Sequence, residues 1–71
     1  MLSARLLEAL IKERTAQGLT QKELAARMGV RNVSFIQKIE YNKDRDIKLS
    51  TIERYAAALG VRLDITLGNR Q

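Results

Sequence analysis

The sequence contains no cysteine and no histidine, and its aromatic residues are limited to two tyrosines and one phenylalanine. The first two absences exclude disulfides and the usual zinc sites, and so few rings disfavour a stacking platform for single-stranded nucleic acid. No apolar run approaches the roughly 20 residues of a membrane span. Residues 1–11 are interrupted by charges and lack the cleavage site of a signal peptide. We therefore expect a cytoplasmic protein without a cofactor or a membrane partner.

Size and charge point to a partner. A chain of 71 residues forms one domain at most and is only marginally stable alone, so oligomerisation is the remaining reinforcement once disulfides and metals are excluded. Lysine and arginine number 13 against 8 acidic residues, a formal net charge of +5. Such a balance suits nucleic acid first and an anionic membrane second, although a merely soluble charged surface has the same composition.

The residue pattern gives no support to an enzyme. Histidine and cysteine are absent, and the acidic residues are scattered instead of clustered. No glycine-rich phosphate loop and no pairing of a nucleophile with a base stands out. We expect a binding protein.

Apolar residues at helical spacing predict four helices. We expect them at about residues 3–17, at 21–28, from a cap at Asn32 or Ser34 to near Tyr41, and at 50–59. The expected left-handed terminators are Gly18, Gly29, Asn42 and Gly60. Residues 20–23 and 50–53 each have the sequence of a capping box, in which a hydroxyl and a glutamate satisfy each other's backbone N–H groups.

After Gly60 the period changes to two, which indicates a half-buried strand over residues 61–67 and disfavours the alternative of a fifth helix. A lone strand leaves its backbone groups unpaired, so we expect it to pair with the same strand of a second copy. The dimerisation residues would be Val61, Leu63, Ile65 and Leu67. The expected organisation is a mainly α domain over 1–60, a dimerisation strand over 61–67 and a polar tail over 68–71.

Two short helices joined through Gly29 have the spacing of a helix-turn-helix, whose second helix enters the major groove, although an ordinary corner between two helices has similar spacing. Residues 18–30 resemble the helix-turn-helix of the Cro/CI-type (xenobiotic response element, XRE) repressor family. Residues 36–40 resemble the end of its recognition helix, and residues 50–60 resemble its following helix. The resemblance covers roughly residues 5–60. It implies a lambda-repressor-like four-helix fold that binds double-stranded DNA. The strand-like segment 61–67 resembles one branch, the HipB-type antitoxins of toxin–antitoxin pairs.

One departure concerns the recognition helix. The family usually has ten positions from the turn glycine to the glutamate that ends this helix, whereas Glu40 is eleven positions after Gly29. One residue is added around 30–33, and two registers that differ by one position are open. Counting back from Glu40 gives candidates for reading bases. Their side chains can donate hydrogen bonds to base edges, accept hydrogen bonds from them, or touch a thymine methyl. These candidates are Asn32 at the cap, Val33, Ser34, Gln37 and Lys38.

Other residues are expected to position the protein. Gln21, at the start of the second helix, can bind a phosphate together with the free N–H groups there, and the resemblance supports that role. Arg31 can reach a base or a phosphate. Further phosphate candidates are Lys43, Arg45 and Lys48. The resemblance also implies a partly buried, structural ion pair between Arg14 and Glu40, from which Arg14 can also contact a phosphate.

These features predict a homodimeric repressor on a palindromic operator, with recognition helices about 34 Å apart. The HipB-type resemblance implies an antitoxin that autoregulates its operon and also holds a toxin protein. A stand-alone phage-type or metabolic regulator without a toxin is the first alternative. A protein-interaction adaptor that does not bind DNA is the second.

The expected pairing of residues 61–67 between two copies of the chain can be tested with Ile65→Pro. Proline cannot donate to a strand ladder, so this substitution should convert the dimer to a monomer. Sedimentation velocity measures the change, and a sedimentation profile that matches the parent protein would rule out pairing through residues 61–67.

Overall fold

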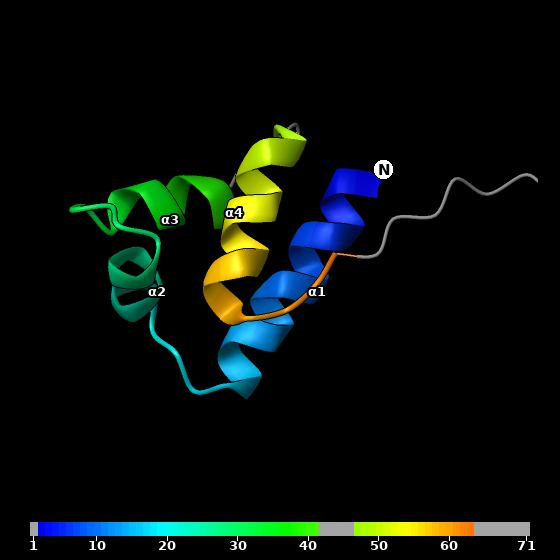
Figure 1. The fold of residues 1–71 in the computed structure, drawn as a ribbon. Helices are drawn as coiled ribbons and strands as arrows, with labels where there is room; N and C mark the ends of the chain where they lie inside the picture. The colour runs from blue at the N-terminus through cyan, green and yellow to red at the C-terminus, as the bar shows by residue number, and fades with distance from the viewer. Residues whose placement is uncertain (1, 42–46, 64–71) are drawn as a thin grey trace, which may run out of the picture.

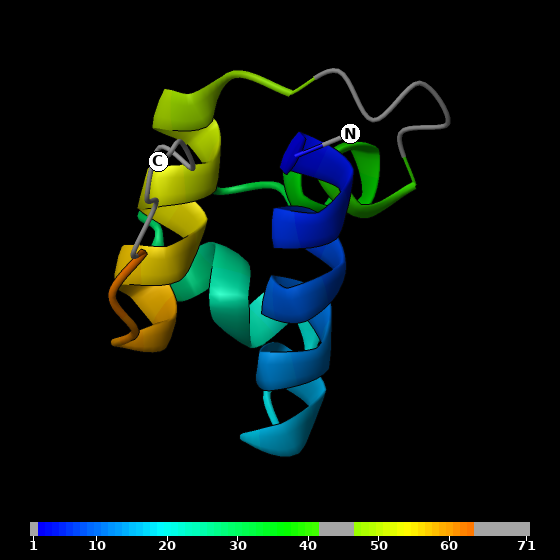
Figure 2. The ribbon, with the colours of Figure 1, turned by 90° about the vertical axis from the view of Figure 1, so that its right-hand side faces the viewer.

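The computed structural model describes residues 2–41 and 47–63. In that part of the chain all regular secondary structure is helical: α1 (Leu2–Ala16), α2 (Gln21–Arg27), α3 (Ser34–Glu40) and α4 (Leu49–Leu59). Helices α1 and α4 lie side by side and run in broadly the same direction, and α2 and α3 pack beside them (Figures 1 and 2). The expected mainly α, four-helix fold is confirmed. None of the described helices has the length and apolar character needed to cross a bilayer.

One apolar core joins the four helices. Each helix contributes residues at the helical spacing read from the sequence, which places them on a single face. The buried members are Leu7, Leu10, Leu24, Ala25, Ile36, Ile39, Ile52, Tyr55, Ala56 and Leu59. Burying one leucine or isoleucine contributes roughly 1.5–3 kcal/mol, so each is a large fraction of the stability of a domain this small.

The two expected capping boxes have different outcomes. At α2, Thr20 Oγ1 accepts the N–H of Glu23 at 3.0 Å, and Glu23 Oε1 accepts the N–H of Thr20 at 2.8 Å, so this box is confirmed. The box expected to open α4 at Ser50 is wrong. Helix α4 begins at Leu49, one residue earlier than expected. Its N-cap residue is the extended Lys48, and no side chain makes a capping hydrogen bond there. Ser50 therefore lies inside the first turn, where its backbone is helical and unlike that of an N-cap.

The expected strand over 61–67 is not confirmed. Residues 61–63 have no regular secondary structure in the single chain, and a strand needs a neighbour to satisfy its backbone groups. Val61 and Leu63 are half-buried and pack against the core, and Arg62 between them is exposed. The remaining dimerisation candidates and the polar tail lie outside the described residues, as does the predicted terminator Asn42.

The capping box makes the stability of α2 depend on pH. Hydrogen bonds from the backbone and the side chain of Thr20 hold the pKa of Glu23 below its ordinary value. Because the folded-state pKa lies below the unfolded-state one, the stabilisation is complete above the ordinary glutamate pKa of about 4.3. It is lost as the pH falls through the folded-state pKa.

We predict that Glu23→Ala lowers the free energy of unfolding at neutral pH, and that its difference from the parent protein shrinks in acid, below the ordinary glutamate pKa. Urea unfolding at neutral and acidic pH measures the difference. Glu53→Ala, on an exposed position of α4, is the control, because it removes a carboxylate that belongs to no capping box. A Glu23→Ala difference that is the same at both pH values would contradict the assignment.

Candidate nucleic-acid interface

The chain reverses between α2 and α3 at Gly29, whose φ of +75° is left-handed. The N–H of Gly29 donates to Ala26 O at 3.1 Å and that of Val30 to Ala25 O at 3.0 Å, which are the two bonds of a Schellman motif. A Cβ at Gly29 would meet no heavy atom within 4 Å. Glycine is therefore needed for its backbone conformation rather than for space. Val30 packs against the core directly after the turn and anchors the chain there.

The residue that we expect to be added relative to the family pattern, around 30–33, would lie in the connection that leads into α3. Arg31 and Asn32 are exposed, and Asn32 Oδ1 accepts the N–H of Ser34 at 2.9 Å. The N-cap of α3 is Val33 instead of the expected Asn32, so Asn32 closes a turn one residue before the cap. The connection thus accommodates the additional residue outside the helix.

Helix α3 has a buried face and an exposed face. Ile36, Ile39 and Glu40 are buried, and Gln37 and Lys38 are exposed. At the start of the helix, Val33 and Ser34 are half-buried. The base-reading candidates therefore lie at the beginning of α3 and along its outer face.

The phosphate candidates are in different surroundings. Arg31 and Lys48 are exposed, whereas Lys43 and Arg45 lie outside the described residues. Gln21 is half-buried at the first position of α2. Its amide nitrogen donates to Glu40 Oε1 at 2.9 Å and to Tyr41 Oη at 3.3 Å, so both amide protons are used inside the protein.

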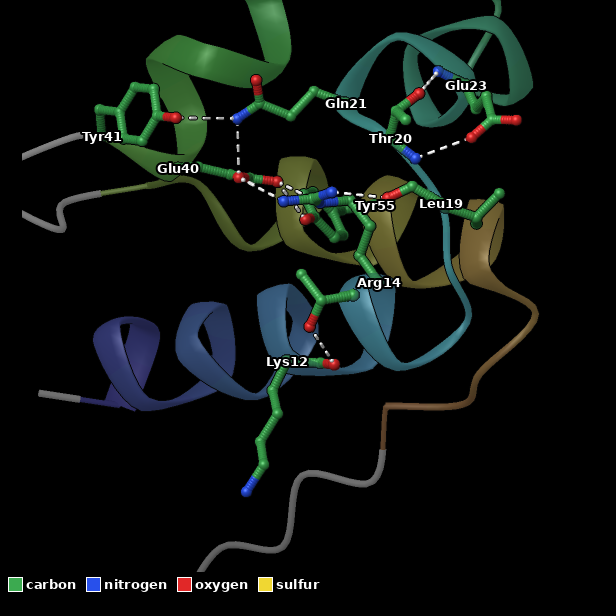
Figure 3. A network of polar contacts seen from close by, with 10 residues as sticks. Lys12, Arg14, Leu19, Thr20, Gln21, Glu23, Glu40, Tyr41 and Tyr55 are labelled. Carbon is green, nitrogen blue, oxygen red and sulfur yellow. Dashed lines mark hydrogen bonds and ion pairs between the residues drawn. The ribbon is translucent and has the colours of Figure 1, made fainter.

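The carboxylate of Glu40 connects the four helices (Figure 3). Arg14, from α1, donates from Nε to Oε2 at 2.9 Å and from Nη2 to Oε1 at 3.2 Å. Gln21, from α2, donates to Oε1, and Tyr55, from α4, donates to Oε2 at 2.5 Å. The side chains of Arg14 and Glu40 are 11% and 3% exposed. The pair implied by the resemblance is thus an ion pair at the edge of the core.

Arg14 also fixes the connection between α1 and α2. Its Nη1 donates to Leu19 O at 2.6 Å, and its own carbonyl accepts the N–H of Leu19 at 3.1 Å. Leu19 is half-buried against the core and directly precedes Thr20, which caps α2. The position of α2 is therefore determined from both sides, by Leu19 before it and by Gln21 at its start.

The surroundings keep Arg14 and Tyr55 in the protonation states that their contacts with Glu40 need. Burial opposes the charge of Arg14, but the hydrogen bond and the charge of Glu40 outweigh it and raise the pKa of Arg14. Burial raises the pKa of Tyr55, and the hydrogen bond to Glu40 raises it further. Arg14 consequently stays charged, and the Tyr55 hydroxyl stays a donor.

Two tyrosines of this region were not predicted as site residues. Tyr55 lies at an apolar position of a helical pattern, which predicts a core residue, and it is fully buried. The signal that could have identified its second role is its hydroxyl, because a buried phenol needs a hydrogen-bond partner. Tyr41 follows the last residue of α3 and is 69% exposed.

The ion pair can be tested with a double-mutant cycle. We predict that Arg14→Met and Glu40→Gln each lower the free energy of unfolding by about 3 kcal/mol, because each leaves a buried charge without the opposite charge beside it. The double variant should lose less than the sum. Urea unfolding followed by circular dichroism measures the three variants. Arg5→Met, at an exposed position of α1, is the control, and strictly additive losses would show that the two side chains are not coupled.

Comparison with known proteins places the chain in a family. The helix-turn-helix family model matches residues 10–65. Antitoxin HigA1 of Mycobacterium tuberculosis strain ATCC 25618 / H37Rv is 48% identical over 65 residues, which cover 89% of this chain and 41% of the relative. Antitoxin HigA1 of strain CDC 1551 / Oshkosh gives the same values.

The chain thus spans about two fifths of the length of the curated relatives that it matches. No solved structure matches significantly. These relatives are named as antitoxins, which agrees with the predicted resemblance to antitoxins. Their name gives no information on whether the chain belongs to the HipB-type branch. Because the family model matches most of the chain and the relatives match nearly all of it, this protein belongs to the XRE-type helix-turn-helix family.

Proposed function

We propose that this protein is a sequence-specific regulator that binds double-stranded DNA and represses transcription. The observation that carries the proposal is the outer face of α3, which the Gly29 turn and the core hold at a fixed position relative to α2. In helix-turn-helix proteins the second helix lies in the major groove and the first crosses the backbone. Gln37 and Lys38 are exposed on that second helix, where they would face base edges.

The side chains on this face suit direct readout of bases. Lys38 can donate to guanine O6 and N7, and Gln37 can pair with the N6 and N7 positions of adenine. Ser34 can donate or accept, and Val33 can touch a thymine methyl. Asn32 uses its amide oxygen to accept the N–H of Ser34, so we expect it to contact DNA through its amide protons.

Basic residues outside α3 would position the protein without reading sequence. Arg31 in the connection before α3 and Lys48 at the start of α4 are exposed, and Lys43 and Arg45 are further candidates from the sequence. Contacts of this kind go to phosphates, so they release counterions and make affinity fall steeply with salt. This salt dependence separates a DNA-binding role from that of a protein-interaction adaptor.

We further infer a homodimer that binds a palindromic operator and an antitoxin role in which the protein also binds a toxin. The alternation of residues 61–67 supports the dimer, and the name of the HigA1 relatives supports the antitoxin role. A HipBA-like system is the form that the sequence predicted. The second candidate is a stand-alone regulator. The two can be distinguished by expressing the neighbouring gene with and without this protein. A toxic product whose toxicity this protein relieves would support the antitoxin, and the absence of such a gene would support the stand-alone regulator.

The recognition face can be tested with the double variant Gln37→Ala/Lys38→Ala. We predict that it loses the preference for sequences selected by the parent protein from random double-stranded DNA, because it lacks two base-reading side chains. Each contact is worth roughly 1–3 kcal/mol of discrimination. Competition binding against unrelated DNA of the same length measures the preference.

Lys12→Ala is the matched control for charge, because Lys12 is exposed on α1 and points away from the Glu40 cluster in Figure 3. It should keep the parent's sequence preference. If Gln37→Ala/Lys38→Ala retains that preference as well, the base-reading face is assigned incorrectly.

A further inference from the structure

Tyr41 is held in place without being buried. Its side chain is 69% exposed, compared with 48% for Leu49, the other exposed large hydrophobic residue among the side chains whose burial the structure describes. The core therefore does little to fix its ring. Its hydroxyl, however, accepts a hydrogen bond from Gln21 Nε2 at 3.3 Å. A polar contact between the end of α3 and the start of α2 thus positions an aromatic side chain at the surface.

Glu40 determines which way the Gln21 amide faces. A carboxylate oxygen can only accept hydrogen bonds, so the group 2.9 Å from Glu40 Oε1 must be the amide nitrogen of Gln21. The second amide proton is then donated to Tyr41, and Figure 3 shows the Gln21 nitrogen in contact with both Glu40 and the Tyr41 hydroxyl. The side-chain amide of Gln21 has no proton left for a phosphate, and its amide oxygen is an acceptor, which a phosphate oxygen would repel.

The Tyr41 hydroxyl has the opposite character. Because it accepts from Gln21, its own proton remains available, and among the described residues it donates to none. The contact with Gln21 uses the phenol oxygen as an acceptor, and the side chain is exposed, so the O–H group can donate to an acceptor that approaches from solvent. The Gln21–Tyr41 pair therefore presents a neutral donor at the surface where α2 begins and α3 ends.

The geometry points to the Tyr41 hydroxyl as a donor to a phosphate oxygen of the DNA backbone, with Gln21 as the residue that positions it. This inference rests on the proposed DNA binding. In a docked helix-turn-helix the first helix crosses the backbone beside the groove, so the junction of α2 with the end of α3 lies near phosphates. Tyrosine is among the side chains that contact them. The phosphate role expected for the Gln21 side chain passes to Tyr41.

The test is Tyr41→Phe, which removes one hydroxyl from an exposed ring and leaves the core unchanged. We expect DNA affinity to fall roughly tenfold, the loss expected for one hydrogen bond to a charged group. Preferred and unrelated sequences should lose affinity alike, because a phosphate contact carries no sequence information. The slope of affinity against salt should stay the same, because tyrosine is neutral, whereas Lys48→Ala should make it shallower. Thermal unfolding should match that of the parent.

Ethylation interference identifies the contact directly. Ethylation of one phosphate in each half-site should weaken the parent and should have no further effect on Tyr41→Phe. Binding by Gln21→Met should also become insensitive to ethylation of that same phosphate. A role of Gln21 limited to folding would not remove the sensitivity at one particular phosphate. Unchanged affinity of Tyr41→Phe, or retained sensitivity at every phosphate, would overturn the inference. A parent protein that shows no salt-dependent DNA binding would instead overturn the proposed function.

Discussion

The arrangement of the described part of the protein depends on the carboxylate of Glu40. Its oxygens accept hydrogen bonds from Arg14, Gln21 and Tyr55, so one side chain of α3 is bound to each of the other helices. A buried carboxylate without partners would cost several kcal/mol. The four helices must therefore come together in one relative arrangement to satisfy it. The apolar core supplies most of the stability, and the Glu40 cluster makes one packing of that core more favourable than the others.

The same cluster links stability to the proposed recognition surface. The C-terminal end of α3 is fixed by Glu40, while the residues proposed to read bases lie at the other end and on the outer face. Gln21 belongs to both parts, since it donates to the buried Glu40 and to the exposed Tyr41. A substitution in the buried part of the cluster would consequently alter DNA binding through geometry, even though the substituted residue need not touch DNA.

The helices could be predicted because their signals are local. Apolar spacing, the glycines after α1, α2 and α4, and the capping box at Thr20 all depend on neighbours in sequence. The box at Ser50 failed although its sequence is as good, because the helix begins one residue before Ser50: Lys48 is the extended residue before it, and Ile47 packs against the core. A capping sequence shows that a residue is able to cap a helix, but it does not fix the residue at which the helix starts.

The candidate site was harder to predict than the helices. The Arg14–Glu40 pair came from the family resemblance and not from spacing, since the two residues are 26 positions apart. The direction of the Gln21 amide and the hydroxyl role of Tyr55 depend on side chains brought together by the fold, so no local pattern contains them. The strand at 61–67 has the alternation of a half-buried element, but its pairing would depend on a second chain.

The two ends of the segment between Gly29 and Glu40 are anchored in different ways. Val30 is fixed by the bonds that end α2, and Glu40 is fixed by its cluster, so the connection between them is the part in which a length change is accommodated. Relatives should therefore be aligned on the glutamate and not on the turn glycine when reading positions are compared. We therefore expect that a residue can be gained or lost in this connection while the outward face of α3 keeps its orientation.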